Sequence, residues 1–323
     1  IYVIDAASLA GRSFGDLVLR SATNRPIGRI RSTGEVELAP DPATSVEVGD
    51  RLVVIADNEA NLEVGRDEPS DHVLAPIGEA FRIDRALREE HVLVIGWNAL
   101  GIQLVGELQR ATTLESTIEI VYDSRLFEPE DIEVTGTGVT LTPARKDMFE
   151  LSDISQTKKF TTVVILGYRR GTSVEEADSR TLLTNMLVRR DLESLSGPTP
   201  RVLVELLDAD NIALARMTGA DDFRVSDAIG SRVVVQLAEQ PERRSVLLSL
   251  YEGAGPSVHL VPADEIGLRG EVDGGEMVSA ALGAGLLAIG WRRSLERGGK
   301  VYLNPHRDTH ITLEDGDQLV VIA

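Results

Sequence analysis

The sequence predicts an α/β protein in which a doubly wound parallel sheet is flanked, along the chain, by two copies of a smaller α/β lobe. Short apolar strands alternate with helical stretches in the middle of the chain, which is typical of a parallel sheet covered by helices. The two ends of the chain repeat each other. The 323 residues include no cysteine, so these cores form without disulfides or thiolate metal sites.

Composition narrows the classes of function. Hydrophobic residues make up 42% of the chain, enough for real cores, and a formal net charge of −19 argues against nucleic acid as a partner. An acidic surface favours solubility or divalent-cation binding. The longest uncharged run, Met277 to Trp291, is shorter than a membrane span requires. Because the chain begins at Ile1 without methionine or signal peptide, we expect a piece of a longer protein.

The repeat is the strongest internal signal. The matching segments are Val36–Pro40 with Val301–Pro305, Gly49–Ala56 with Gly316–Ala323, and Gly15–Val18 with Gly275–Val278. Their offsets agree when two residues are inserted just before the second Gly-Asp pair. Each copy is predicted to be strand, short helix, strand, glycine turn, strand, loop and strand. Matched turn residues at matched spacing indicate one small fold used twice.

Between the copies the pattern changes. Residues 59–88 carry acids, prolines and little periodicity, and indicate a linker. The run His91–Gly101 is predicted to open with a strand, followed by a tight turn and a helix that extends to about Arg110. The further predicted strands of the central sheet are 118–122, 139–142, 162–166, 202–206 and 223–225, and the further predicted helices are 174–194 and 209–217. Residues 227–251 are predicted to be helical with an interruption at Pro241. Such a helix packs either on its own lobe or on a second subunit, and we favour a dimer contact.

The turn after the first central strand resembles a dinucleotide fingerprint, which makes the central lobe Rossmann-like. Gly96 and Gly101 occupy the first and third glycine positions, but Asn98 replaces the glycine that lets the backbone approach a pyrophosphate. Asp123 lies where an acid would bind a ribose hydroxyl. We favour a relic of the fold over a bound dinucleotide, with Gly96, Asn98, Gly101 and Asp123 as the residues that would hold one.

Carboxylates also gather where predicted strands end. Asp123, Asp208 and Asp210 fall at the carboxyl ends of strands, with Arg169 nearby, and parallel sheets bind ligands at that edge. A Ca²⁺ or Mg²⁺ site made of these three acids is one interpretation, since hard cations prefer oxygen ligands. The other, which we favour, is that they are solvated loop acids and helix caps.

No arrangement of residues in the sequence supports a catalytic function. A hydride-transfer enzyme needs an acid or base near the nicotinamide, and His91 lies at the opposite edge of the sheet. Neither a Ser-His-Asp arrangement nor a nucleophile elbow is present. We therefore expect a sensor module and not an enzyme.

Three segments carry a resemblance to a known family: Val92–Asn98, Glu176–Leu183 and Ala220–Asp227. With them, residues 90–323 resemble the regulatory region of the Castor and Pollux ion channels, whose bacterial relatives contain RCK domains (regulators of potassium conductance). The Gly-Asp-x-Leu-Val-Val-Ile-Ala endings are similar to the C-lobe that closes an RCK domain. The plant members of the family are linked with calcium regulation.

The resemblance implies a domain plan. Residues 1–58 would be the C-lobe of a first RCK domain, whose N-lobe lies upstream, and 59–88 the linker. Residues 89–240 would be the Rossmann-like N-lobe of the second RCK domain, and 241–323 its crossover helix and C-lobe.

It also implies a role and partners. The chain would be the ligand-sensing module of a tetrameric gating ring, at the cytoplasmic face of the plasma membrane and beneath an upstream transmembrane pore for cations, potassium above all. Dimer contacts would run through residues 227–251. The alternative is a stand-alone nucleotide-binding regulator of a transporter, or an NAD-dependent oxidoreductase, which would bind dinucleotide tightly.

Overall fold

The chain divides into two compact units, one of which contains both ends of the sequence. The computed structural model describes residues 1–58, 62–66, 81, 89–134, 136–144, 160–193, 199–251 and 255–323, so most of the predicted linker 59–88 lies outside the described residues. Unit 1 comprises Ile1–Asp84 and Gln236–Ala323, and unit 2 comprises Arg85–Val235. No described helix combines the length and apolar character that crossing a membrane requires.

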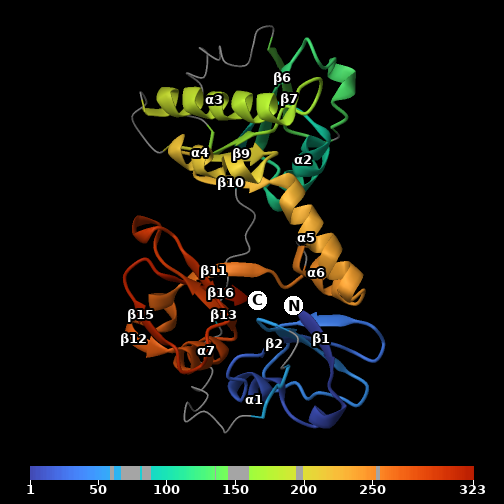
Figure 1. Cartoon of the computed structure of the whole chain (residues 1–323), viewed down its shortest axis with the longest axis vertical. Coiled ribbons are helices and arrows are strands. Elements are labelled where there is room, and N and C mark those ends of the chain that lie inside the picture. Colours follow the sequence, from blue (N-terminus) through green and yellow to red (C-terminus); the bar gives the residue numbers. More distant parts are fainter. Residues whose placement is uncertain are drawn as a thin grey trace. The chain divides into compact units, whose positions relative to one another are not determined.

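Unit 2 is a doubly wound sheet of six parallel strands in the order β10-β9-β8-β5-β6-β7 (Figure 1). Its strands are β5 (His91–Ile95), β6 (Thr117–Asp123), β7 (Val139–Ala144), β8 (Thr162–Ile165), β9 (Arg201–Leu206) and β10 (Asp222–Val225). Its helices are α2 (Ala99–Ala111), η2 (Pro129–Asp131), α3 (Val174–Glu193), η5 (Ala209–Asn211) and α4 (Ile212–Met217). The helix α5 (Ser226–Glu239) follows β10 and continues into unit 1.

The sheet has a separate apolar core on each face. Leu93 and Ile95 of β5 pack in one core with Val188 of α3, whereas Val92 and Val94 pack in the other with Val105 of α2. The central strands are apolar on both faces because helices cover both, as the uninterrupted apolar runs predict. The predicted fold class is therefore confirmed.

The repeated ends fold alike. Copy 1 (residues 2–56) and copy 2 (residues 259–323) form antiparallel sheets in equivalent orders, β1-β4-β2-β3 and β11-β16-β13-β14. The elements of copy 1 are β1 (Tyr2–Asp5), η1 (Ala7–Leu9), α1 (Phe14–Leu19), β2 (Arg25–Ile30), β3 (Val36–Leu38) and β4 (Arg51–Ile55). The elements in and around copy 2 are β11 (Val258–Pro262), η6 (Ala263–Ile266), β12 (Gly270–Asp273), α7 (Gly274–Gly283), β13 (Leu287–Arg292), η7 (Leu295–Arg297), β14 (Val301–Leu303), β15 (His310–Leu313) and β16 (Gln318–Ile322).

The inserted residues do not lie where the sequence placed them. Gly15 and Gly275 donate to equivalent loops, which fixes the first part of the match. Asp50 N–H donates to Glu47 C=O, and Asp317 N–H to Glu314 C=O, so Glu47 corresponds to Glu314. Pairing Val48 with Leu313 is therefore wrong: Val48 is 84% exposed in the turn, whereas Leu313 is buried in β15. The insertion lengthens β15, which pairs with β12 along four residues.

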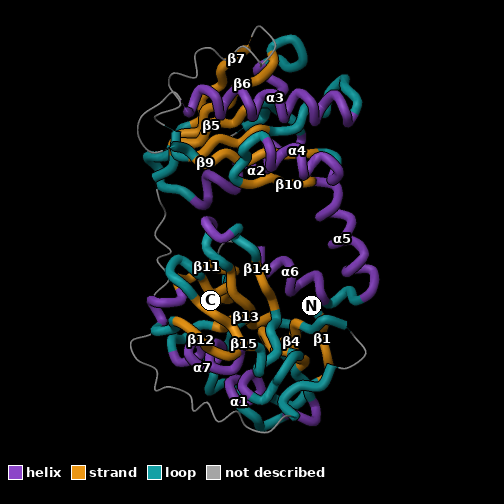
Figure 2. The backbone as a smooth tube through the Cα atoms, turned by 60° about the vertical axis from the view of Figure 1, so that its left-hand side comes forward, coloured by secondary structure: helices purple, strands orange, loops and turns teal. Residues whose placement is uncertain are grey.

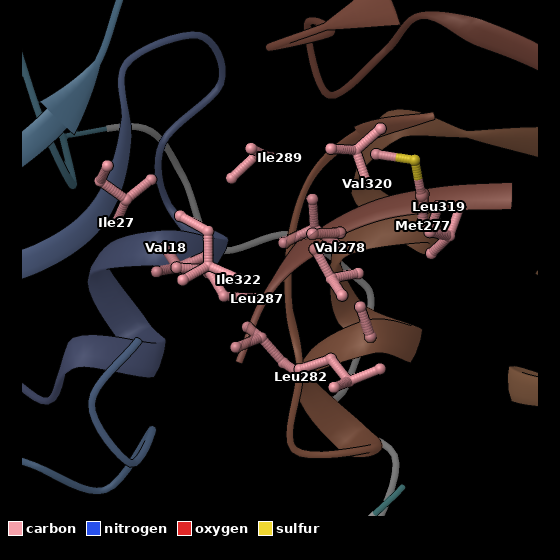
Figure 3. Close-up of a cluster of buried hydrophobic side chains, with 14 of the residues drawn as sticks. Val18, Ile27, Met277, Val278, Leu282, Leu287, Ile289, Leu319, Val320 and Ile322 are labelled. Carbon is pink, nitrogen blue, oxygen red and sulfur yellow. The ribbon is translucent and has the colours of Figure 1, made fainter. Parts of the chain in front are cut away.

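The two copies share one hydrophobic core, which the sequence did not predict. Val18 and Ile27 of copy 1 belong to the same buried cluster as Val278 and Leu287 of copy 2 (Figure 3). The short helices α1 and α7 lie side by side in this unit (Figure 2). The helix α6 (Arg243–Tyr251) adds Val246 to the cluster. Lobes this small bury too little surface alone, so sharing a core stabilises both.

Candidate functional site

The turn between β5 and α2 keeps the shape of a nucleotide-binding turn. Gly96 has φ +88°, a left-handed conformation in which other residues are strained, and its N–H donates to Val121 C=O at 2.9 Å. Asn98 then caps α2, because its Oδ1 accepts from Leu100 N at 2.9 Å. This residue pair turns the chain sharply from strand into helix.

The side chain of Asn98 holds three strands together. Its Nδ2 donates to Gly167 C=O at 2.8 Å and to Glu205 Oε2 at 2.8 Å. Both partners lie at the carboxyl ends of neighbouring strands, Gly167 just beyond β8 and Glu205 in β9. Asn98 therefore makes a structural tie at the position where a dinucleotide-binding turn needs glycine.

Glu205 is the residue at this edge that sequence reasoning missed. It is 3% exposed, and it accepts from Gly167 N at 2.9 Å and from Arg169 Nη2 at 3.0 Å, besides Asn98. Buried carboxylates need such partners to offset lost hydration. The signal was present in the sequence as an acid inside the apolar strand Arg201–Leu206.

Gly101 makes room for an indole ring. A Cβ on Gly101 would lie 2.5 Å from the ring of Trp97, closer than atoms can pack. Trp97 is buried in the core beneath α2. The third glycine of the fingerprint thus lets α2 begin against the Trp97 ring.

The carboxylate of Asp123 is already hydrogen-bonded to a neighbouring residue, Arg125. Its carboxylate accepts from Arg125 N and Nε, each at 2.9 Å, and from Arg125 Nη2 at 2.5 Å. The Arg125 guanidinium holds the pKa of Asp123 below its ordinary value, although burial of the carboxylate acts the other way. Asp123 lies where a ribose-binding acid would, but Arg125 takes the hydrogen bonds that a ribose would need.

Little space remains beside the turn. The pocket lined by Gly96, Trp97, Asp123, Phe127 and Arg169, among others, has a volume of about 10 Å³. That volume holds about one water molecule. Among the described residues, the side chains around this pocket leave no room for a dinucleotide beside the turn.

The predicted carboxylates do not form one ligand set. Asp208 accepts from Asp210 N at 2.9 Å and so caps η5, which agrees with the interpretation of these residues as loop acids and helix caps. Asp178, which the sequence did not single out, accepts from Leu207 N and Asp208 N and from Asn211 Nδ2. Across the described residues, no group of three or more His, Asp or Glu side chains is placed to hold a metal ion.

A larger cavity lies on the α2 face of the sheet. Its volume is about 220 Å³, and apolar side chains dominate its walls. The lining includes Leu104 of α2, Leu166, Leu203 and Phe223, with Asp222 and Arg224 at the β10 side. Cavities for drug-sized ligands measure about 300–1,000 Å³. This one suits a small apolar group.

Sequence comparison points to one kind of protein. The ion channel CASTOR of Lotus japonicus is 24% identical over 255 residues, which cover 73% of this chain and 27% of that protein. The probable ion channel CASTOR of Oryza sativa subsp. japonica is 23% identical over 256 residues, with coverage of 73% and 26%. The chain thus spans about a quarter of the length of these relatives. No model of a known protein family matches it.

Structure comparison agrees on the fold. The structure of the human SLO3 gating ring superposes with a TM-score of 0.66 at 13% identity, covering 99% of this chain and 65% of that one. The crystal structure of the GsuK RCK domain covers 98% of this chain and 58% of that one at 15% identity, with a TM-score of 0.36. The expected resemblance to a Castor-type channel is confirmed, and the fold, with its Rossmann-like unit, is that of a gating ring.

Proposed function

We propose that this chain is the cytosolic ligand-sensing module of a gating ring, part of a longer protein with a cation-conducting pore. One observation carries the proposal: a Rossmann-like unit is joined in one chain to a unit of paired small lobes, the arrangement of the gating-ring fold. Similarity to CASTOR channels over 73% of the chain supports it. The domain plan follows: 1–58 ends a first RCK domain and 89–323 forms a second.

The alternative of a nucleotide-dependent enzyme is not favoured by the site. Asn98 bonds Gly167 and Glu205, and Asp123 bonds Arg125, so the residues that would hold a dinucleotide already hold one another. A ligand must therefore stabilise a different arrangement of this edge in order to change the ring, since a ligand shifts an equilibrium only through differential affinity. The tie through Asn98 is the contact such a ligand would have to replace.

The experiment is cation flux through the longer protein in liposomes. We expect potassium flux that changes with calcium, magnesium or NAD, each added alone. Asn98→Ala should alter that response while flux persists, because the substitution unties β5 from β8 and β9. Gln103→Ala, an exposed position on the same helix, is the matched control. Absence of flux in the reconstituted protein, or tight NAD binding with hydride transfer, would contradict the proposal.

Assembly is proposed to run through α5. Val234 and Val235 are 65% and 58% exposed on this helix, although apolar residues favour burial. A second copy that covers them would give the dimer contacts of a tetrameric ring. Native mass spectrometry of Val234→Asp/Val235→Asp should then show smaller assemblies than wild type. Leu114→Asp, at a position 91% exposed in a loop, should leave the size of the assembly unchanged. If wild type and both variants form assemblies of the same number of subunits, this contact is contradicted.

A further inference from the structure

Arg25 places a buried positive charge at a position where the fold does not require one. It opens β2 and is 1% exposed inside unit 1. Arg25 pairs with Ile55 of β4, and in copy 2 the equivalent partner Ile322 pairs with Leu287. Leu287 is buried in the apolar core (Figure 3). The same place in the same fold therefore accepts leucine, so the arginine has another reason to be there.

The guanidinium of Arg25 is mostly unsatisfied. Its Nη2 donates to Pro305 C=O at 3.2 Å, which is a contact from copy 1 to copy 2. Nε and Nη1 have no hydrogen-bond partner among the described residues. Burial lowers the pKa of Arg25 to about 10, so the side chain still carries its charge at pH 7. A buried charge without partners is strongly unfavourable, so this group needs an acceptor.

A small cavity adjoins this side chain at the junction of the copies. Arg25 and Ser21 of copy 1 line it together with Gly275, Val278 and Arg307 of copy 2. The lining contains two arginines and no carboxylate. About 10 Å³ of it is open to the centre of a water-sized sphere, which leaves room for one small particle. A backbone hydrogen bond joins the two copies next to this cavity, because Arg307 N donates to Ala22 C=O at 2.9 Å.

We propose that this cavity is a binding site for a small monovalent anion of the size of chloride. An anion accepts from the unpaired N–H groups of Arg25 and also neutralises its buried charge, whereas a water molecule accepts without neutralising that charge. The second arginine of the lining, Arg307, already pairs with Asp308 at 3.5 Å. Polyatomic anions such as phosphate exceed the space. Residues of both copies form the site, so it exists only while the copies share their core. Anion binding therefore stabilises the docked pair of lobes.

The first test is thermal unfolding of the 323-residue chain at constant ionic strength, with sodium chloride replaced stepwise by sodium gluconate, whose anion is too large for the cavity. We expect the melting temperature of unit 1 to rise with chloride and to saturate. Arg25→Leu, the residue that copy 2 uses, should lose this dependence. Arg66→Leu is the matched control, because Arg66 is exposed and pairs only with Glu63 among the described contacts; it should keep the wild-type dependence.

The second test needs no variant. Crystals grown in sodium bromide should show an anomalous peak within hydrogen-bond distance of Arg25 Nε or Nη1. A chloride dependence that survives in Arg25→Leu overturns the proposal, and so does a bromide map with only water beside Arg25. If Arg25→Leu does not fold, the bromide map of the wild type decides alone. Neither test involves a pore, so their failure leaves the gating-ring proposal standing, and the reverse also holds.

Discussion

Copy 1 and copy 2 have equivalent four-stranded sheets and stabilise them with different chemistry. Arg29 faces Glu37 across β2 and β3 and binds it at 2.7 Å. The equivalent pair across β13 and β14 is Trp291 and Tyr302, whose rings stack with centroids 4.6 Å apart. A cross-strand pair needs complementary side chains, and an ion pair and an aromatic stack both qualify. The difference shows which positions the fold fixes and which it leaves to side-chain choice.

The fixed positions are those where backbone meets backbone. Gly28 and Gly290 follow equivalent irregularities in β2 and β13, and each faces a backbone carbonyl of the next strand. The turn acids Asp50 and Asp317 are both buried, and both accept from the backbone N–H three residues earlier. Their arginine partners come from different places: Arg29 lies in β2, whereas Arg297 follows β13. The carboxylate is thus conserved between copies while its cation is not.

The largest expected effect concerns the glycine pair. A Cβ on Gly290 would lie 2.1 Å from Tyr302 C=O, and one on Gly28 2.5 Å from Glu37 C=O. Because backbone cannot yield cheaply, Gly290→Ala and Gly28→Ala should each lower the free energy of unfolding by about 3 kcal/mol. Urea unfolding read by hydrogen exchange of unit 1 peptides measures this. Gly106→Ala in α2 is the control, because a Cβ there would meet nothing closer than Arg110 Nη2 at 3.9 Å. Near-neutral effects at Gly28 and Gly290 would contradict the equivalence of the two copies.

The second-largest expected effect concerns Asp317, the buried acid of the Gly-Asp turn in copy 2. Asp317→Asn should lower the free energy of unfolding by about 2 kcal/mol at pH 7, the usual value for charge-assisted hydrogen bonds. Burial raises the pKa of Asp317, but bonds from Arg297, Glu314 and Ser294 outweigh it and hold the pKa below 3.8. A depressed folded pKa gives stability that is present above the unfolded value and lost as pH falls through the folded one.

The difference in the free energy of unfolding between wild type and Asp317→Asn should therefore disappear as the pH falls below about 4. Unfolding measured from pH 7 to pH 2.5 tests this, with Asp315→Asn, an exposed neighbour, as the control. A gap that stays constant over this range would show that the charge of Asp317 contributes nothing.

The cross-strand pairs should differ in their response to salt. Double-mutant cycles to alanine should give about 1 kcal/mol of coupling for Trp291 with Tyr302 and a similar value for Arg29 with Glu37. Raising sodium chloride from about 0.1 to about 1 M should reduce only the second, since salt screens charges and not stacked rings. Equal salt dependence of the two couplings would mean that the copies are less different than their side chains indicate.

The smallest effect concerns two left-handed residues. Ala39 has φ +43° and Asn304 has φ +49°, and their N–H groups donate to Ile27 and Ile289 at equivalent points. Alanine is strained in this conformation whereas asparagine tolerates it. Ala39→Gly should raise the free energy of unfolding by about 0.5 kcal/mol, after the entropy of glycine in the unfolded chain is subtracted. Asn304→Gly should change it less, and differential scanning calorimetry can compare them; a larger gain at Asn304 would reverse the argument.

Much of the fold could be predicted because it depends on local patterns. The apolar strand His91–Ile95 can be predicted from a few consecutive residues, and so can the Gly-Asp turns before β4 and β16. The two-residue insertion was misplaced because Val48 and Leu313 look alike in sequence, although one is exposed and the other buried. Burial is decided by what packs against a residue, and periodicity over so short a loop does not report it.

The candidate site was predicted less completely. Spacing alone placed Gly96, Asn98 and Gly101 at the turn after the first central strand and Asp123 at the end of the next strand, and the loss of the ligand-facing glycine argued for a relic. Partners distant in the chain could not be seen: Asn98 and Glu205 are 107 residues apart, yet they share a hydrogen bond of 2.8 Å. The same holds for Asp178, whose carboxylate binds backbone beyond β9.

By itself, the sequence determined the fold class, the repeat and the glycine positions of the nucleotide-like turn, because each follows from local periodicity and turn chemistry. Only the tertiary structure decided that the two copies share a core, that Asn98 and Asp123 bond within the protein, and that Nε and Nη1 of Arg25 are buried without a partner among the described residues. The reason is physical. Hydrogen-bond satisfaction and burial are properties of groups brought together from distant parts of the chain, and no short stretch of sequence contains both partners.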